Sequence, residues 1–230
     1  RNTKDVINDS SLNLDLEEIN FSDSPEILIA GCGTGQHAIT TASKYNKSKI
    51  LALDLSFKSL SYAKRKANEL KINNIDFIQG DILDLKSIDR KFDIIESVGV
   101  LHHMDNPFEG LKMLTSCLNN DSLMQIGLYS EKARQHIKQI KNRINKLKLQ
   151  SNYKNIVNFR KDLIENNNDE WNYIKSSPDF YTVSGVRDLL FHVQEHRFNI
   201  PEIKNYINKL NLKFCGFENK VLLDFSIENH

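Results

Sequence analysis

Glu26 to His37 read Glu-Ile-Leu-Ile-Ala-Gly-Cys-Gly-Thr-Gly-Gln-His, and this stretch decides the fold. An apolar run passes directly into three alternating glycines and then into residues compatible with a helix. This order predicts a strand, a tight turn and a helix start. Glycines suit a backbone that turns sharply or lies close to a ligand, and the helix that follows offers unpaired amides. The stretch therefore favours a nucleotide-like ligand, with a purely structural turn as the alternative.

The spacing of the glycines separates two kinds of nucleotide ligand. Gly31, Gly33 and Gly35 form the pattern G-x-G-x-G. The dinucleotide fingerprint G-x-G-x-x-G requires a glycine at the next position, where this chain has Gln36. The spacing therefore disfavours a nicotinamide cofactor.

Length, charge and cysteine content exclude several classes of protein. The 230 residues suffice for one sizeable domain without disulfides, and Arg1 in place of Met suggests part of a longer chain. The three scattered cysteines form no disulfide framework or zinc knuckle, which favours reduced thiols in a cytoplasmic protein. A net charge of +1 gives no global attraction for nucleic acid or membranes, and no apolar run is long enough to cross a bilayer. We therefore expect neither partner.

Strand-like runs alternate with helix-like stretches after a polar N-terminal edge segment, residues 1–24. The domain itself is expected to span residues 25–230. The predicted strands after the glycine turn are 49–54, 75–79, 92–97 and 122–128. The predicted helices between them are 36–45, a helix after Ser56 with Leu60, Ala63, Ala67 and Leu70 on one face, and 107–118. This rhythm implies right-handed crossovers, and so a Rossmann-like, doubly wound α/β fold with a mostly parallel sheet.

Polar side chains fall where these predicted strands end, which is where such sheets bind ligands. Asp54 closes the second strand, 19 residues after Gly35, a place from which a carboxylate can accept hydrogen bonds from a ribose. The alternative for Asp54 is a helix cap or an exposed loop acid. Asp81 follows the third strand, and the pair His102 and His103 follows the fourth.

Four segments in order resemble the class I S-adenosylmethionine-dependent methyltransferases: Ile-Ala-Gly-Cys-Gly-Thr-Gly, Leu-Asp-Leu-Ser, Gln-Gly-Asp-Ile, and Phe-Asp-Ile-Ile-Glu-Ser-Val-Gly-Val-Leu-His-His. The resemblance implies S-adenosylmethionine as cofactor, with the glycines at its methionine part, Asp54 at the ribose, and Asp81 with Ile82 at the adenine. The implied cofactor-binding residues are Ala30, Gly31, Cys32, Gly33, Gly35, Asp54, Leu55, Asp81, Ile82 and Ser97. Ile29 stands where the family commonly has an acid, so backbone carbonyls are expected to anchor the amino group.

Residues 129–198 interrupt the alternating pattern and are expected to form a helical insertion after the fifth strand, where the resemblance implies a substrate lid. Residues 131–161 hold ten Lys or Arg and one acid, which favours an amphipathic helix with a solvated basic face over a phosphate-binding patch. Further along, we expect a loop over 162–180, helices from Ser184 to Val193 and from Pro201, and strands over 211–218 and 221–225. Residues 176–218 also resemble a bacterial methyltransferase subgroup found beside tetratricopeptide repeats.

The acceptor is expected to be a small molecule more readily than a protein, and the sequence identifies no particular one. The resemblance makes His102 and His103 candidate catalytic residues, since a histidine is a suitable base for an acceptor that must lose a proton. Candidate substrate-binding residues in the insertion are Tyr181, Arg187, His192 and Glu195. Two further alternatives to a methyltransferase are a nicotinamide oxidoreductase and a non-catalytic nucleotide-binding module.

A zinc protease is the rival enzyme class. His192 to His196 match the pattern H-x-x-E-H, which on a helix places both histidines on one face. A third ligand would have to come from an acid further along the chain, and none is evident. We therefore predict no metal at these residues.

Overall fold

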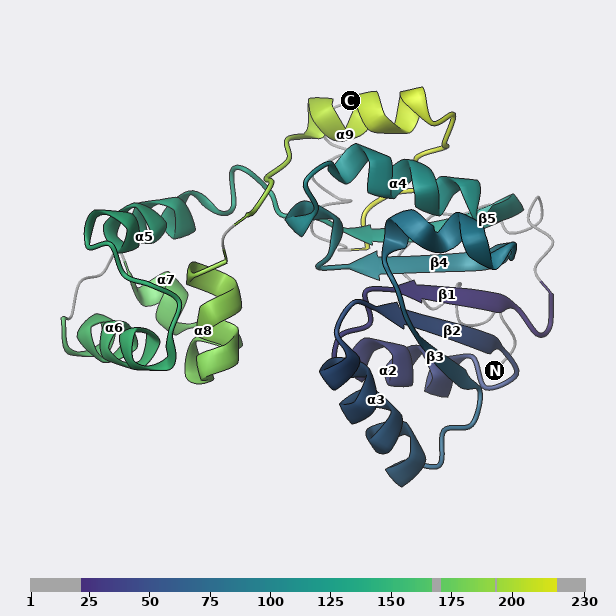
Figure 1. Ribbon diagram of the computed structural model, residues 1–230. Coiled ribbons are helices and arrows are strands. Elements are labelled where there is room, and N and C mark those ends of the chain that lie inside the picture. The colour runs from purple at the N-terminus through teal and green to yellow at the C-terminus, as the bar shows by residue number, and fades with distance from the viewer. Residues whose placement is uncertain (1–21, 167–170, 193, 219–230) are drawn as a thin grey trace. The chain divides into compact units, whose positions relative to one another are not determined.

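The computed structural model describes residues 22–166, 171–192 and 194–218 (Figure 1). Nearly all of the expected N-terminal edge segment and the expected strand 221–225 lie outside these ranges. The described chain forms two compact units. The first contains residues 22–101, 106–128 and 201–218, and the second contains His102–Asp105 and Tyr129–Ile200.

The first unit is built on a five-stranded sheet. The strands are β1 Glu26–Ala30, β2 Lys49–Asp54, β3 Ile75–Gln79, β4 Phe92–Val98 and β5 Leu118–Gly127, in the order β3-β2-β1-β4-β5. All four pairings are parallel, which confirms the predicted Rossmann-like α/β fold. The order reverses between β1 and β4, and this is the switch point at which such sheets bind ligands.

One strand begins earlier than the sequence pattern predicts. The pattern places the start of β5 at residue 122, but Leu118 already pairs with Phe92. The register then shifts, because Asp121 adopts a positive φ of 55°, and regular pairing resumes at Leu123 opposite Ile94. This irregular opening removes the alternating pattern by which a strand is normally recognised.

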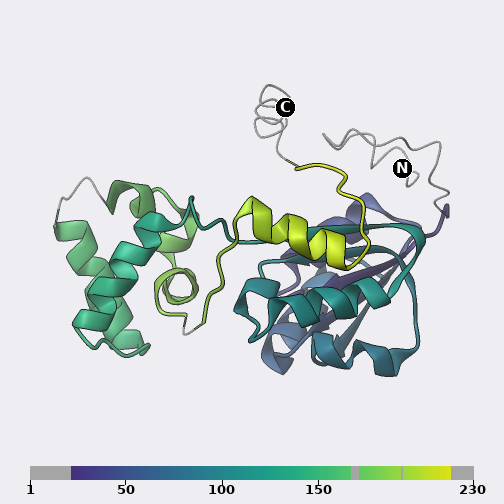
Figure 2. The ribbon, with the colours of Figure 1, turned by 90° about the horizontal axis from the view of Figure 1, so that it is seen from above.

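Helices cover both faces of this sheet (Figures 1 and 2). The elements between the strands are α2 Gln36–Lys44, α3 Phe57–Glu69, the 3₁₀ helix η1 Ile82–Ile88 and α4 Pro107–Ser116. Ala38 and Ala42 of α2 and Leu60 of α3 pack with Ile27 and Ile29 of β1 in one apolar cluster. On the other side α4 packs with η1, so both faces of the central strands are buried, as their continuous apolar sequence requires.

The last described helix lies beside α4. This helix is α9, Ile200–Lys209, and it begins one residue before the predicted Pro201. Figure 1 shows the two helices next to each other. The ring of Tyr206 lies 4.9 Å from that of Phe108 of α4, and the ammonium group of Lys209 lies 5.6 Å from the centre of the Phe108 ring. The expected strand over 211–218 is wrong, because residues 212–217 join no hydrogen-bonded ladder within the described chain.

The second unit is helical. Its elements are α5 Gln135–Lys146, α6 Tyr153–Glu165, α7 Asn172–Lys175, the 3₁₀ helix η4 Pro178–Tyr181 and α8 Val183–Leu190; the short 3₁₀ helix η2, Leu101–His103, leads into it. A core of its own holds these helices together, with members from α5, α6, α7, η4 and α8. The predicted loop over 162–180 is therefore wrong in part, because α6 extends into it and α7 and η4 lie within it.

The N-terminus of α8 also differs from the prediction. Thr182, rather than Ser184, is the N-cap, and its hydroxyl accepts a hydrogen bond from the amide of Gly185 at 2.9 Å. The helix ends at Leu190 instead of Val193, where the amide of Phe191 closes the last turn on the carbonyl of Arg187.

The two ends of the second unit's long segment are joined to each other. The amide of Phe198 donates to the carbonyl of Tyr129 at 2.8 Å, and the amide of Glu131 donates to the carbonyl of Phe198 at 2.9 Å. Ser130 and Phe198 thereby form an isolated parallel bridge.

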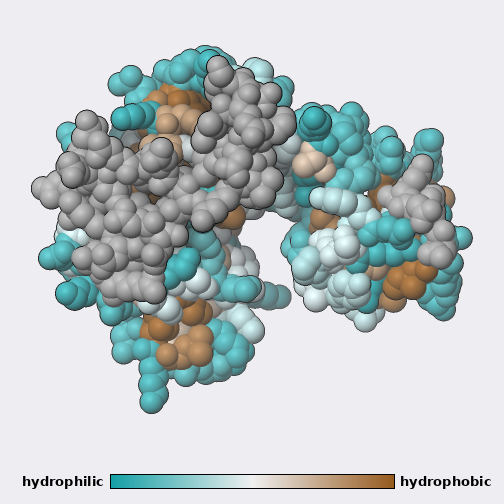
Figure 3. All heavy atoms as spheres, turned by 180° about the vertical axis from the view of Figure 1, so that it is seen from behind, coloured by the Kyte–Doolittle hydropathy of each residue, from teal (hydrophilic) through white to brown (hydrophobic). Residues whose placement is uncertain are grey.

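The visible surface is mostly hydrophilic. Figure 3 shows hydrophobic side chains on one face in small, separate patches. Within the described ranges, no helix combines the length and the apolar character that crossing a bilayer would require.

Candidate functional site

The carboxyl ends of β1 to β4 lie along one edge of the sheet, because the four strands run parallel. The chain after β1 turns back onto β2: the amides of Gly31 and Cys32 both donate to the carbonyl of Leu53, at 2.8 and 2.9 Å. Within the turn, the amide of Gly35 donates to the carbonyl of Cys32 at 2.9 Å. These three backbone hydrogen bonds help to fix residues Gly31–Gly35, which we call the glycine loop.

The glycines of this loop are required for different reasons, although all three have positive φ angles. A Cβ on Gly31 would lie 2.2 Å from a methyl of Val100, and a Cβ on Gly35 would lie 2.5 Å from the Cβ of Ala63. A Cβ on Gly33 would meet no protein atom within 4 Å. Gly31 and Gly35 therefore allow close packing of the protein, whereas Gly33 leaves one side of the loop open for a ligand.

Asp54 ties the end of β2 to the glycine loop. One carboxylate oxygen accepts a hydrogen bond from the amide of Gly33 at 2.7 Å, and the other accepts from the amide of Ser56 at 2.8 Å. The N-cap of α3 is Ser56 itself, whose hydroxyl accepts from the amide of Ser59. Asp54 is therefore neither the cap of α3 nor an isolated loop acid.

The other predicted cofactor residues fall along the same edge. Asp81 caps η1 by accepting from the amide of Leu83 at 2.9 Å, and Ile82 beside it is buried. Leu55, directly after β2, is 67% exposed. Ser97 is fully buried, and its hydroxyl donates to the carbonyl of Ala30 at 3.1 Å.

Cys32 lies in the loop as a neutral thiol. Burial, together with the nearby charge of Asp54, raises its pKa to about 12. The thiol is therefore not a nucleophile at neutral pH, because the thiolate is the reactive form.

Sequence analysis missed three side chains that lie behind the glycine loop. Glu96 of β4 is buried, and its carboxylate accepts a hydrogen bond from the hydroxyl of Thr41 at 2.7 Å. The ring of His37 lies 2.8 Å from the same carboxylate. The available signal was an acid inside an otherwise apolar run, two residues after Ile94.

The predicted catalytic histidines belong to the second unit, where they form a cluster of stacked rings. His102 is fully buried and stacks on Tyr129, with ring centroids 3.6 Å apart. His103 stacks on His192 at 3.7 Å. The structure therefore brings a predicted catalytic residue and a predicted substrate residue into contact. The carbonyl of His102 also accepts a hydrogen bond from the amide of His196 at 2.7 Å.

His103 has a defined tautomer. Its Nδ1 lies 3.0 Å from the carbonyl oxygen of Gln194, which can only accept, so Nδ1 carries the proton. Burial lowers the pKa of His103, against the opposing effect of this hydrogen bond. The neutral ring therefore presents Nε2 as a proton acceptor.

Glu195 lies at the centre of a buried ion pair. Arg134 binds it through two hydrogen bonds of 3.0 and 2.9 Å, and Lys141 adds a third at 2.8 Å. The guanidinium of Arg134 also lies 3.6 Å from the ring centre of Tyr129. Burial acts to raise the pKa of Glu195, but the hydrogen bonds from Arg134 and Lys141 lower it.

The remaining predicted substrate residues lie apart from this cluster. Tyr181 is 65% exposed at the end of η4, and Arg187 is exposed on α8. Neither is in ring contact with the stacked histidines among the described residues, whereas His192 and Glu195 both take part in the network around Tyr129.

The H-x-x-E-H segment is not helical. His192 and residues 194–197 follow the end of α8 in extended or irregular backbone, so the helical face assumed for a zinc site does not exist. The carboxylate of Glu195 is occupied by two cations. No group of three or more potential metal ligands lies together in the part of the chain that the structure describes.

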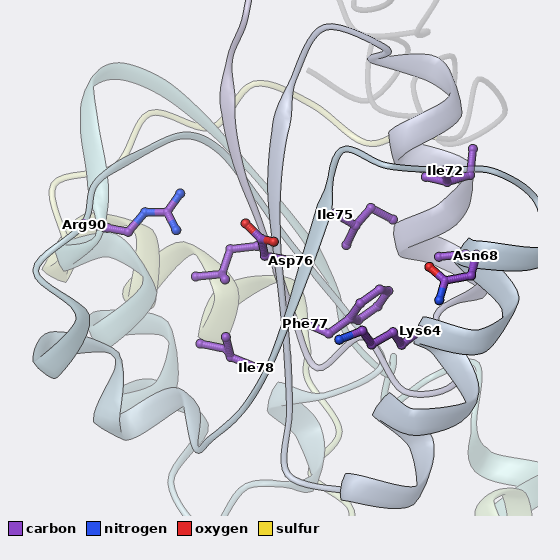
Figure 4. A pocket seen from close by; sticks show the side chains of 10 residues that line it. Lys64, Asn68, Ile72, Ile75, Asp76, Phe77, Ile78 and Arg90 are labelled. Carbon is purple, nitrogen blue, oxygen red and sulfur yellow. The ribbon is translucent and has the colours of Figure 1, made fainter.

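A cavity of about 440 Å³ lies on the flank of β3 (Figure 4). It is lined on one side of the strand by Lys64 and Asn68 of α3, and Arg90 lies on the other side. None of its lining residues belongs to the glycine loop, and neither Asp54 nor Asp81 is among them. It is therefore separate from the candidate cofactor site.

Comparison with known proteins identifies a family. The family model described as "Methyltransferase domain" matches residues 22–175. An uncharacterized protein, syc1184_c of Synechococcus sp., is 28% identical over 85% of this chain and 49% of its own length. A probable (S)-tetrahydroprotoberberine N-methyltransferase of Papaver bracteatum is 30% identical over 53% of this chain and 34% of its own length.

Among solved structures, PKMT2 from Rickettsia typhi has a similar fold. Its TM-score is 0.72 at 20% identity, over 91% of this chain and 42% of that chain. The same protein in complex with AdoHcy gives a TM-score of 0.69. The chain spans less than half the length of each of these three proteins. With two thirds of its residues within the matched range, the chain belongs to the methyltransferase domain family.

Proposed function

We propose that this chain is an S-adenosylmethionine-dependent methyltransferase domain that acts on a small-molecule acceptor. The observation that carries the proposal is the convergence of the glycine loop, Asp54 and Asp81 at the carboxyl ends of three neighbouring parallel strands. The AdoHcy complex of PKMT2 and the N-methyltransferase relative from Papaver bracteatum support it, since AdoHcy is the demethylated product of the cofactor.

The residues present fit this cofactor. Gly33 leaves open space above the loop, where the methionine part would lie between Gly31 and Gly35. Asp54 has two carboxylate oxygens near that space and would hold the ribose hydroxyls. Leu55, exposed beside it, would pack against the adenine, with Asp81 and the backbone of Ile82 at its edge.

Three of the proposed cofactor residues can contribute only through their backbone. The side chains of Ala30, Cys32 and Ser97 are buried, and the hydroxyl of Ser97 is already bonded to Ala30. Backbone carbonyls near the glycine loop would anchor the cofactor's amino group, since Ile29 stands where the family commonly has an acid.

The cofactor supplies an activated methyl group, so the protein's main task is to orient the acceptor. Orientation alone contributes on the order of 7–11 kcal/mol in well-aligned reactions. An acceptor oxygen or nitrogen that must lose a proton also needs a base. His103 suits this role, because it is neutral and presents Nε2, whereas the ring of His102 is enclosed against Tyr129.

The proposed acceptor-binding residues are His192 and Glu195, with Tyr181 and Arg187 as outer candidates. Glu195 would act through its ion pairs with Arg134 and Lys141, which hold its own stretch of chain in place and so help to keep His192 stacked on His103. A compact cluster of aromatic rings with one buried ion pair suits a small polar acceptor. The second candidate function is a nucleotide-binding module without catalysis, in which the same loop and Asp54 would serve binding alone.

Calorimetric titration of the full chain tests the proposal. S-adenosylmethionine and AdoHcy should both bind, whereas NAD should not, because Gln36 replaces the third glycine of its fingerprint. Asp54→Ala should weaken both about ten- to a hundredfold, corresponding to about 1–3 kcal/mol for lost hydrogen bonds. Asp84→Ala, which removes an exposed acid from η1, is the matched control.

Two results would contradict the proposal. Unchanged affinity in Asp54→Ala would remove the ribose assignment. Binding of both ligands without methyl transfer to any compound in a broad acceptor screen would instead favour the non-catalytic module.

A further inference from the structure

Glu96 is a buried acid on a strand that is otherwise apolar on the same face. It is 7% exposed and is the register partner of Ile29, the residue two positions before the glycine loop. Register partners on neighbouring parallel strands point to the same face, and this is the face on which Ala38 and Ala42 of α2 pack. A carboxylate among such residues is costly unless it is hydrogen-bonded.

Both contacts of this carboxylate come from α2. The hydroxyl of Thr41 donates to Oε2 at 2.7 Å, and Nε2 of His37 lies 2.8 Å from the same oxygen. Residues 37 and 41 are one helical turn apart and so share a face. Glu96 therefore joins the carboxyl end of β4 to the first two turns of α2.

The start of α2 has little else in its own sequence to fix it. Its N-cap is Gly35, the last residue of the glycine loop, with no side-chain hydrogen bond and no acid in the first turn. Any movement of these first turns would therefore carry the loop with it.

We propose that Glu96 is a positioning residue for the glycine loop and thereby for the cofactor. The inference rests on the proposed function of that loop. The loop is then held from both neighbouring strands. Asp54 fixes it to β2 through the amide of Gly33, and Glu96 fixes it to β4 through His37 and Thr41.

This arrangement makes cofactor affinity dependent on pH. The charged groups that act on His37 are Glu96, Lys44 and Glu218. The contact with Glu96 raises the pKa of His37, against the opposing effect of burial. The ion pair is complete when the imidazole is protonated and is lost as the pH rises through that raised pKa. Cofactor binding should therefore weaken over the same range.

The test is AdoHcy titration of the full chain at about pH 6 and about pH 8.5, on either side of the ordinary histidine pKa. Glu96→Gln keeps the shape and the contact with Thr41 but removes the charge. It should weaken AdoHcy binding about three- to tenfold at the lower pH, and its affinity should change less with pH than that of the wild-type chain. His37→Gln should show the same flat pH dependence. Glu109→Gln, an exposed acid of α4, is the control.

The outcomes separate this inference from the proposed function. If the wild-type chain does not bind AdoHcy, the proposed function fails. If the wild-type chain binds and Glu96→Gln matches the Glu109→Gln control in affinity and pH dependence, only the positioning role is overturned. A loss of thermal stability with unchanged affinity would likewise reduce Glu96 to a structural residue.

A variant that does not fold leaves the inference testable. If circular dichroism shows that Glu96→Gln is unfolded, Thr41→Val and His37→Gln each remove one contact and keep the carboxylate. Each should weaken AdoHcy binding about two- to threefold at the lower pH. Wild-type affinity in both would overturn the positioning role.

Discussion

Gly35→Ala should destabilise the first unit more than Gly33→Ala, although each adds one methyl to the glycine loop. Gly35 has a φ of 85°, and a left-handed conformation costs an alanine about 1–2 kcal/mol. The added Cβ would also lie 2.5 Å from the Cβ of Ala63 and 3.1 Å from its backbone Cα, which cannot move without displacing α3. Overpacking of this kind costs about 1–3 kcal/mol, so the expected total is about 2–5 kcal/mol.

Urea unfolding of the full chain, followed by circular dichroism, measures this loss, and a melting curve should show a fall of at least about 4 °C. Gly33→Ala is the matched control, since Gly33 also has a positive φ, of 53°, but open space around the new methyl. It should cost only about 1–2 kcal/mol of stability. It should nevertheless weaken AdoHcy binding about tenfold or more, because its methyl occupies the proposed ligand space.

A second substitution separates the steric contribution from the rest of the stability loss that Gly35→Ala causes. Ala63→Gly removes the Cβ that Gly35→Ala would meet, at a cost of about 1 kcal/mol for glycine within a helix. The double variant should therefore be more stable than the sum of the two single losses by about 0.5–3 kcal/mol. Strict additivity, or equal losses in Gly33→Ala and Gly35→Ala, would refute close packing as the reason for glycine at position 35.

Three further predictions concern the second unit. His192→Ala should slow methyl transfer to an identified acceptor while AdoHcy affinity stays within about threefold, because only acceptor contacts are lost. Equal losses in the methyl-transfer rate and in AdoHcy affinity would exclude acceptor binding by His192. Glu195 has a lowered pKa, so its contribution to stability is present above the unfolded value of about 4.3 and is lost as the pH falls through the folded value. On acidification, the free energy of unfolding measured in urea should therefore fall less for Glu195→Gln than for the wild-type chain. An identical fall in the two proteins would contradict this contribution of Glu195. His103 should titrate below about 6.5 in nuclear magnetic resonance spectra, and its buried neutral ring should make folding less favourable as the pH falls below that value; titration at or above it would contradict the effect of burial.

The sheet could be predicted because its signals are local. Buried parallel strands are continuous apolar runs, and three alternating glycines mark the turn after β1. Asp54 and Asp81 were found by the same logic, since residues at strand ends must meet at one edge. The prediction failed at 211–218, where an apolar alternation is present but no neighbouring strand pairs with it in the described chain.

The second unit could not be predicted to the same degree, because its decisive contacts are distant in sequence. Val186, Leu189 and Leu190 have helical spacing that Val193 continues, yet α8 ends at Leu190. The following segment is held instead by Arg134 and Lys141, which are 61 and 54 residues from Glu195. These ion pairs also explain why Arg134 and Lys141 are largely buried, although the basic residues of 131–161 were expected to be solvated. Their partner Glu195 lies outside residues 131–161.

Glu96 shows a related limit. An acid on a strand can be recognised in the sequence, but its register partner cannot. Only the pairing of β1 with β4 reveals that it lies opposite Ile29, and only the placement of α2 reveals its contacts with Thr41 and His37.

The bridge between Tyr129 and Phe198 gives the helical segment a common point of entry and exit. Because the two ends are hydrogen-bonded to each other, residues can be gained or lost between them without pulling on the strands. Each doubling of such a closed loop costs only about 0.6 kcal/mol in chain entropy. The segment between residues 130 and 198 can therefore change in length while the bridge still holds its two ends together.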